Sequence, residues 1–146
     1  MRDDAEGLTK GESLYLKELY RMESEGTKRI TSVSLAMRFS IRPASVVDMF
    51  SKLERKKLLN RRSWRPVKLS RKGAEVAEGL IWRHRILETY FVSILELSPT
   101  EACKAATDID ALIPETVVTA MCAILHHPSR CVHGYIIPHP KGRSSK

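Results

Sequence analysis

The sequence predicts a mainly α-helical fold with one short β-hairpin, and three observations support this prediction. Apolar residues recur at i, i+4 and i+7 over most of the 146-residue chain, which is the period of a helix. Prolines and a Ser-x-x-Glu capping box stand where the periodic stretches begin, as they do at helix starts. Residues 34–69 show the order helix, tight turn, helix, hairpin. That order is typical of a winged helix-turn-helix, and further helices follow it.

The first predicted helix covers about residues 8–25. Its apolar stripe consists of Tyr15, Leu19 and Met22, at positions i, i+4 and i+7. Gly26 supplies a C-terminal stop. Thr31 or Ser32 is expected to N-cap a second, short helix that ends near Phe39.

The third predicted helix follows a tight turn at residues 40–42 and opens with Pro43, which suits a first helical turn. Its inward face is expected to contain Val46, Val47, Phe50 and Leu53. The face left polar contains Ser45, Asp48, Lys52 and Arg55. Two strand candidates, residues 58–62 and 67–69, flank a short loop and complete the predicted wing.

The sequence pattern of the C-terminal half predicts three more helices. The longest covers about residues 71–97, with Leu80, Leu87 and Ile94 in heptad spacing. A capping box at residues 98–101 opens the next helix. Pro114 opens the last helix, which is expected to end at His127-Pro128. A loop with cysteine and histidine follows, and residues 141–146 are expected to be a disordered tail.

Charge divides the chain into two parts. Residues 1–74 hold 18 Lys/Arg and 9 Asp/Glu, whereas residues 75–146 hold 7 and 8, so their net charges are +9 and −1. Residues 28–72 alone hold 14 basic and 2 acidic side chains. This split predicts a DNA-binding domain over residues 1–73 and a helical assembly domain over residues 74–140. A merely basic surface is the alternative interpretation.

Several classes of protein are disfavoured. No apolar run approaches the roughly 20 residues of a spanning helix, and the acidic start of the chain is unlike a secretory signal. We therefore expect a cytoplasmic protein whose Cys103, Cys122 and Cys131 are thiols or metal ligands rather than disulfide halves. We expect no enzyme, because neither an oxyanion loop nor a Gly-rich phosphate loop is present. A protein-only adaptor is the other alternative, and the basic segment argues against it.

Apolar surface in the C-terminal half predicts self-assembly. The stripes over residues 102–112 and 117–125 contain more apolar surface than a monomer of this length can bury, so we predict a two-fold dimer. The expected partners are a second copy of the chain and double-stranded DNA, with no membrane and no small-molecule substrate.

Four segments together resemble the diphtheria toxin repressor and manganese transport regulator family of metal-dependent transcriptional regulators. They are Tyr15-Leu-x-x-Leu-Tyr20, Pro43-Ala-Ser-Val-Val-Asp-Met-Phe50, Arg83-His-Arg-x-Leu-Glu88 and His127-Pro-x-x-Cys-x-His-Gly-x-x-Ile-Pro138. The resemblance covers about residues 11–138. It implies a homodimer that binds a palindromic operator when loaded with divalent iron or manganese. It also implies a short form without the C-terminal barrel of many members, in which residues 74–140 serve dimerisation and metal binding.

The resemblance assigns DNA contacts to the third helix and the wing. Arg42, Ala44, Ser45 and Asp48 match positions that approach bases, and Lys52, Arg55, Arg62 and Arg65 match positions that clamp the DNA backbone. Arg42 suits a bidentate contact to guanine. Asp48 either accepts a hydrogen bond from cytosine or pairs with Lys52 at i+4, which we favour. Trp64 either occupies an exposed wing tip or folds back over the core.

The main regulatory metal site of the family is expected to be lost. The matching positions hold Leu14, Lys17, Thr107, Asp110 and Ala111. Leucine, lysine and alanine do not ligate a divalent metal in the way this site needs. Two weak oxygen donors do not make a site by themselves.

The second metal site of the family is better matched. His84 and Glu88 are spaced i and i+4 and therefore share a helix face. Cys103 matches a histidine ligand of some members, and Cys131 lies in a Cys-x-His-Gly loop that some members use. The resemblance implies a metal at His84, Glu88, Cys103 and Cys131, with His133 as a spare ligand. Two thiolates favour zinc, and iron or manganese are the next candidates.

The remaining cysteine and histidines are expected to be structural. Cys122 lies on the apolar stripe of the last helix, so we expect it to pack in the core. His126 and His127 are expected to interact with the helix C-terminus. The alternative to metal regulation is a constitutive winged-helix DNA-binding protein whose metal is structural or absent.

Overall fold

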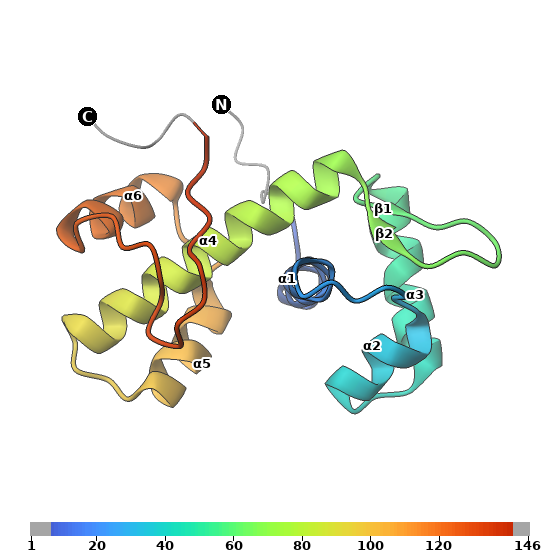
Figure 1. The fold of residues 1–146 in the computed structure, drawn as a ribbon, viewed down its shortest axis with the longest axis horizontal. Coiled ribbons are helices and arrows are strands. Elements are labelled where there is room, and N and C mark those ends of the chain that lie inside the picture. The colour runs from blue at the N-terminus through green and yellow to red at the C-terminus, as the bar shows by residue number, and fades with distance from the viewer. Residues whose placement is uncertain (1–6, 142–146) are drawn as a thin grey trace. The chain divides into compact units, whose positions relative to one another are not determined.

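The computed structural model describes residues 7–141, so residues 142–146 of the predicted tail lie outside the described range (Figure 1). Within that range the structure has six helices and one two-stranded sheet, which confirms the mainly helical fold. The elements are α1 (Lys10–Ser24), α2 (Ser32–Phe39), α3 (Pro43–Arg55), β1 (Leu59–Asn60), β2 (Lys68–Leu69), α4 (Arg71–Ser93), α5 (Pro99–Ile109) and α6 (Glu115–Ile124). None of the described helices is long and apolar enough to cross a membrane.

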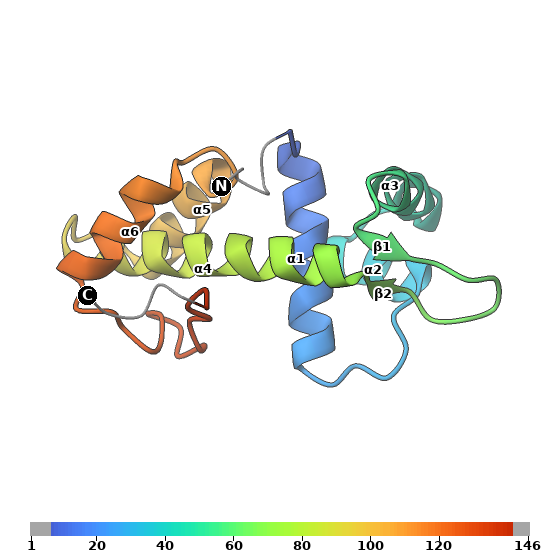
Figure 2. The ribbon, with the colours of Figure 1, turned by 90° about the horizontal axis from the view of Figure 1, so that it is seen from above.

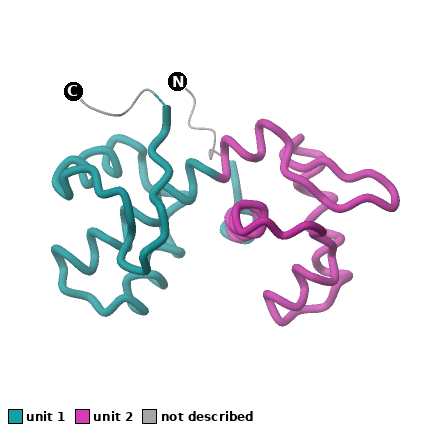
Figure 3. Tube along the Cα trace, viewed as in Figure 1, with its two compact units in different colours: residues 1–13, 78–146 teal, residues 14–77 magenta. Residues whose placement is uncertain are grey.

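The described chain divides into two compact units (Figure 3). The helix-turn-helix unit comprises residues 14–77. The C-terminal unit comprises the described residues before Leu14 and after Ala77. The units therefore divide at two places, within α1 and within α4. The division within α4 lies four residues beyond the boundary predicted at 73/74. The assignment of DNA binding to one domain and metal binding to the other stays a prediction.

Short-range hydrogen bonds set the ends of α2. The Thr31 hydroxyl accepts from the backbone N–H of Ser34 (3.1 Å), and the Ser34 hydroxyl accepts from that of Thr31 (2.9 Å). This is a capping box with serine in place of the usual Glu or Gln. Ser40 ends α2 in the left-handed region, with φ 54°. Pro43 then opens α3, and the buried side chains of these two helices are Leu35, Ala36, Val46, Phe50 and Leu53.

The wing is an antiparallel hairpin whose strands are shorter than predicted. The register pairs Leu59 with Leu69 and Asn60 with Lys68. The turn between the strands already begins at Arg62, whose carbonyl accepts from the N–H of Arg65 (3.1 Å). The strand pairing predicted for residues 61, 62 and 67 is therefore absent, and a long loop projects beyond β1 and β2 in Figure 1.

Backbone contacts join the hairpin to α1 and α4. The N–H of Leu69 donates to the Glu23 carboxylate (2.9 Å), and the N–H of Ser70 donates to the Leu58 carbonyl (3.1 Å). Gly73, in the first turn of α4, lies against the same carbonyl. A Cβ at this position would come within 1.8 Å of the Leu58 oxygen, so only glycine allows this approach.

The C-terminal unit is built around the C-terminal half of α4. In Figure 2, α5 and α6 lie on one side of this helix and the segment after α6 lies on the other. The core contains Trp82, Ile86, Leu87, Phe91, Ala102, Ala106, Val118, Cys122, Cys131 and Ile137. The predicted capping box opens α5, since the Ser98 hydroxyl accepts from the N–H of Glu101 (3.3 Å). Cys122 packs in the core, as predicted.

Two helices end earlier than predicted. α4 stops at Ser93 rather than near Leu97 because Glu96 adopts a left-handed conformation (φ 57°). The N–H of Leu97 then donates to the carbonyl of Phe91 (3.1 Å). Ile94, placed in the heptad stripe from sequence, therefore lies beyond the helix and is 48% exposed. α6 stops at Ile124, before the predicted end at His127.

Candidate DNA interface and metal centre

One face of α3 and the wing is open to solvent. All eight side chains predicted to contact DNA are exposed, namely Arg42, Ala44, Ser45, Asp48, Lys52, Arg55, Arg62 and Arg65. Val47 was expected to face inward but is 42% exposed. It follows Val46 by one residue, and therefore lies about 100° around the helix from the buried stripe. The exposed face is thus wider than predicted, and its contact with DNA remains a prediction.

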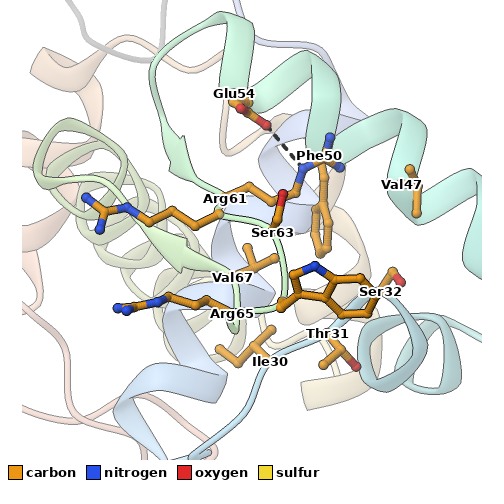
Figure 4. Close-up of a pocket in the computed structure, with 12 residues that line it drawn as sticks. Ile30, Thr31, Ser32, Val47, Phe50, Glu54, Arg61, Ser63, Arg65 and Val67 are labelled. Atoms are coloured by element: carbon orange, nitrogen blue, oxygen red, sulfur yellow. Dashed lines mark ion pairs between the residues drawn. The ribbon is translucent and has the colours of Figure 1, made fainter.

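The expected ion pair between Asp48 and Lys52 is not formed in the part of the chain that the structure describes. Glu54 instead pairs with Arg61 across to the wing (Oε2 to Nε, 3.2 Å; Figure 4). An exposed i, i+4 pair gains little against the entropy of two long side chains. The Asp48 carboxylate is therefore left in water on the exposed face.

The wing tip is exposed rather than folded over the core. Trp64 is 99% exposed and has a left-handed backbone (φ 64°), which excludes the alternative of a lid. The wing and α3 border a pocket that is lined by Ile30, Phe50, Trp64 and Arg65 among others (Figure 4). The indole is thus open to solvent beside the exposed face of α3.

Sequence reasoning missed several basic residues around the hairpin. A second pocket is lined by the cations Lys28, Lys57, Arg61, Arg62, Arg65 and Lys68. Glu54 is the acidic residue among its lining side chains. The net charge of residues 28–72 was the signal for this group, but the pattern along the chain did not indicate which cations share one surface.

Three kinds of metal ligand meet between α4 and α5. His84 Nε2 lies 3.6 Å from Glu88 Oε2 and 3.6 Å from Cys103 Sγ. All three ligand atoms lie within 4.8 Å of one another. Ligand atoms around a tetrahedral zinc ion are separated by about 3.4–3.6 Å, given metal–ligand bonds of about 2.0–2.3 Å. The residues present therefore fit a divalent metal ion.

Glu88 belongs to a second group as well. Its Oε2 lies 3.2 Å from His133 Nδ1, and its carboxylate accepts a hydrogen bond from the Cys131 thiol. Glu88, Cys131 and His133 also lie within 4.8 Å of one another. The structure thus brings Cys131 to Glu88, as the predicted set requires, but groups it with His133 rather than with Cys103.

The charge of the centre follows from burial and these contacts. Burial alone raises the pKa of Glu88, but hydrogen bonds from His84 and Cys131 and the charges of His84 and His133 outweigh it, so the pKa is lowered. Burial and the neighbouring Glu88 raise the pKa of the Cys131 thiol. The resting centre therefore holds a carboxylate and a protonated thiol.

Asp110 is a member of the centre that sequence reasoning assigned elsewhere. It is buried, and its Oδ2 lies 3.1 Å from His84 Nδ1. A carboxylate that accepts from one ring nitrogen fixes the ring orientation and directs the other nitrogen at the ligand cluster. The sequence signal for Asp110 was that its position matches an acidic ligand of the family's main site.

The other positions that match the main site serve different purposes. The Thr107 hydroxyl donates to the Cys103 carbonyl (2.9 Å). Lys17 is 1% exposed, which is unusual for a lysine. Leu14 and Ala111 are partly buried. The loss of the main site stays a prediction.

The C-terminal part of the chain matches a known family of metal-binding proteins. The family model described as "Iron dependent repressor, metal binding and dimerisation domain" matches residues 70–139. The HTH-type transcriptional regulator MntR of Oceanobacillus iheyensis is 31% identical over 77 residues, which is 52% of this chain and 51% of that protein. An uncharacterised HTH-type transcriptional regulator of Methanocaldococcus jannaschii is 25% identical over 104 residues, 71% of this chain and 83% of that protein.

The fold is shared with solved regulators. The structure of the manganese regulator SloR superimposes with a TM-score of 0.79 at 26% identity, over 88% of this chain and 59% of that one. The chain thus spans between about half and four-fifths of the length of these three proteins.

Proposed function

Because the chain belongs to the diphtheria toxin repressor and manganese transport regulator family of metal-dependent transcriptional regulators, we propose that it is a metal-responsive, dimeric DNA-binding regulator that acts in the cytoplasm. One observation supports this most strongly. His84, Glu88 and Cys103 form a compact N, O and S donor set, within the segment that the metal-binding family model matches.

The proposed DNA contact rests on the exposed face of α3 and on the charge around the wing. A recognition helix meets base edges with a few side chains near its N-terminus, while surrounding cations bind phosphate. Arg42, Ala44 and Ser45 lie at the N-terminal end of α3, and Arg62 and Arg65 lie in the wing loop. The wing cations are the source of non-specific affinity, because each phosphate contact releases a counterion.

The proposed metal ligands are His84, Glu88 and Cys103, with Cys131 as the fourth. A bound divalent ion, most suitably zinc, supplies a fixed positive charge that ties the loop after α6 to α4 and α5. Asp110 orients the His84 ring toward the ion. Cys131 gives up its thiol proton to become a ligand, and its hydrogen bond to Glu88 is replaced. His133 is the spare ligand, since its Nδ1 already lies 3.2 Å from the Glu88 carboxylate.

The proposed dimer uses the exposed apolar side chains of α5, α6 and their connection. These are Ile109, Leu112, Val117 and Ile124, each more than one-third exposed. A two-fold dimer is the assembly that a palindromic operator requires, with half-sites about one helical turn of DNA apart.

The test combines metal analysis with DNA binding by the full chain. We expect the protein to bind an equivalent of zinc that His84→Ala removes, and a strong chelator to weaken binding to the preferred operator, selected from a random duplex library. Thr107→Ala is the matched control, because it changes α5 next to the site without removing a ligand. Sequence-selective binding that a chelator leaves unchanged would favour the constitutive alternative, whose supporting observation is that the donors already hydrogen-bond one another.

A further inference from the structure

A second cluster of a thiol and imidazoles lies at the end of α6, apart from the centre described above. Cys122 Sγ lies 3.3 Å from Nδ1 of His127 and 3.8 Å from Nδ1 of His139. The three residues come from α6, from the turn that follows it and from the C-terminal segment. Neither proposed DNA contacts nor the ligands around Glu88 include any of them.

The end of α6 brings His127 back over Cys122. The N–H of His126 donates to the Ala123 carbonyl (3.0 Å) and that of His127 donates to the Cys122 carbonyl (2.9 Å). These two bonds form a Schellman motif. His126 and His127 have φ of 58° and 51°, a region in which glycine is the usual residue. The turn thus places the His127 ring beside the thiol of the same helix.

A backbone hydrogen bond fixes the tautomer of His139. Its Nε2 lies 2.9 Å from the Pro128 carbonyl, which can only accept. Nε2 therefore bears the proton, and Nδ1 is left with a lone pair toward Cys122 Sγ. This is the arrangement that metal-binding histidines show, in which the nitrogen opposite the ligand atom donates to a carbonyl or carboxylate.

We propose that Cys122, His127 and His139 form a second metal site, for a thiophilic cation of the zinc class. A tetrahedral zinc ion with Zn–S of about 2.3 Å and Zn–N of about 2.0–2.1 Å holds sulfur and nitrogen about 3.6 Å apart. The observed separations of 3.3 and 3.8 Å lie on either side of that value. The ring centroids of His127 and His139 lie 6.4 Å apart, and the two histidines do not bring their ligand atoms within 4.8 Å of each other as the groups around Glu88 do. Binding therefore has to draw the two rings together, to the separation of about 5 Å between ring centroids around a tetrahedral ion.

The surroundings suit a metal that can exchange. Cys122 is buried, His139 is half-buried and His127 is exposed, so the fourth position opens to water. Zinc sites that keep an open position have three protein ligands and a water or substrate molecule in the fourth, whereas structural sites are closed by four protein ligands. Burial raises the pKa of the Cys122 thiol, while the adjacent Trp82 acts in the opposite direction. The thiol proton leaves when the sulfur becomes a ligand.

Occupancy of this site would secure the loop that reaches the first centre. The chain between His127 and His139 contains both Cys131 and His133. A metal held by both ends of this loop closes it into a ring, and a closed loop has less conformational freedom to lose when Cys131 docks on Glu88. The second site would therefore tighten metal binding at the first.

Cobalt(II), which reports thiolate coordination by near-ultraviolet charge-transfer absorption, and zinc, which is counted by elemental analysis, test this proposal on the full chain. We expect two equivalents per chain, with His127→Gln and His139→Gln each losing one equivalent and Cys122→Ser losing it together with its thiolate absorption. His126→Gln is the matched control, because it changes the neighbouring left-handed histidine and should keep both equivalents. Circular dichroism checks that each variant is folded, and the glutamines preserve a side-chain hydrogen-bond donor.

The outcomes separate this site from the one at His84. If His127→Gln and His139→Gln retain as many equivalents as His126→Gln, the cluster is a set of thiol–imidazole hydrogen bonds and the proposal is wrong. If His84→Ala loses one equivalent while the second remains sensitive to His139→Gln, both sites stand. If the protein binds only an equivalent that His139→Gln removes, the second site stands and the proposed regulatory centre fails.

Discussion

The two units of this protein hold their functional side chains in opposite ways. In the helix-turn-helix unit all eight candidate residues are exposed and five of them are cations, whereas in the C-terminal unit most candidate residues are buried and form pairs of opposite charge and hydrogen bonds. The contributions of exposed cations to DNA affinity add up, because each cation is attracted to the polyanion separately. A buried set acts as one group, because each member depends on its neighbours for orientation and charge. Substitutions should therefore add in the first unit and couple in the second.

The largest expected effect is loss of metal and stability on disruption of the buried set. His84→Ala and Cys131→Ser should each lower metal content and the melting temperature, since binding energy is shared with folding. The double variant should lose less than the sum of the two. Elemental analysis and thermal unfolding with and without chelator measure this. Additive losses would place the two residues in separate sites.

Removal of the apolar patch should change the assembly. Leu112→Asp should convert the dimer to a monomer, because a carboxylate in the interface is buried without a partner. Met37→Asp is a matched control in the other unit, since Met37 and Leu112 are 77% and 76% exposed. Sedimentation velocity at micromolar concentration distinguishes the two. A wild-type chain that sediments as a monomer with and without zinc would contradict the dimer.

Substitution of the orienting carboxylate should weaken the metal site without removing a ligand. Asp110→Asn should lower zinc affinity by about 10–100-fold, the range seen when a hydrogen-bond partner of a ligating histidine is changed. This differs from the expectation from sequence alone, in which Asp110 had no role in the retained site. Competition with a chromogenic chelator gives the affinity. An unchanged affinity would mean that Asp110 only fills space.

The exposed cations should act independently. Arg62→Ala and Arg65→Ala should each weaken binding to every duplex sequence and reduce the salt slope by about 1, with additive effects in the double variant. Lys141→Ala removes one charge from the C-terminal unit and should leave the slope unchanged. Fluorescence anisotropy over a salt series measures the four variants and the wild type. Affinity that is indifferent to salt would refute the electrostatic account.

The smallest expected effect is a difference between the two capping boxes in how their contributions to the free energy of unfolding depend on pH. Thr31→Ala should cost about 1 kcal/mol at any pH, because its partner Ser34 does not titrate. At α5 the partner is Glu101, whose pKa is lowered by hydrogen bonds from Ser98. The ionised Glu101 therefore contributes to the free energy of unfolding at pH values above the ordinary glutamate pKa. This contribution is lost as the pH falls through the lowered pKa of the folded state. Urea unfolding of Glu101→Gln across acidic pH should show a difference from wild type that shrinks as the pH falls.

Local signals made the helix starts predictable. Thr31, Pro43 and Ser98 act within four residues of themselves, so the chain alone indicates where α2, α3 and α5 begin. Helix ends were harder, because the end of α4 depends on a left-handed Glu96 and a bond from Leu97 to Phe91. Neither residue is a glycine that would have marked the stop.

The candidate metal centre shows the same limit over longer distances. His84 and Glu88 were predictable as neighbours because i, i+4 spacing fixes a common helix face. Asp110 lies 26 residues from His84, and no periodicity relates them. Likewise the grouping of Cys131 with His133 depends on a turn at Gly134, which has φ of 82°. Contacts across loops of this kind need the fold.

Gly73 also has a mechanical consequence. Its Cα rests directly on the Leu58 carbonyl, with no side chain between the two backbones. The hairpin and the first turn of α4 therefore move as one part, because no rotamer change can absorb a displacement between them. A larger residue at position 73 would therefore separate the hairpin from the first turn of α4, and the two would lose their direct backbone contact.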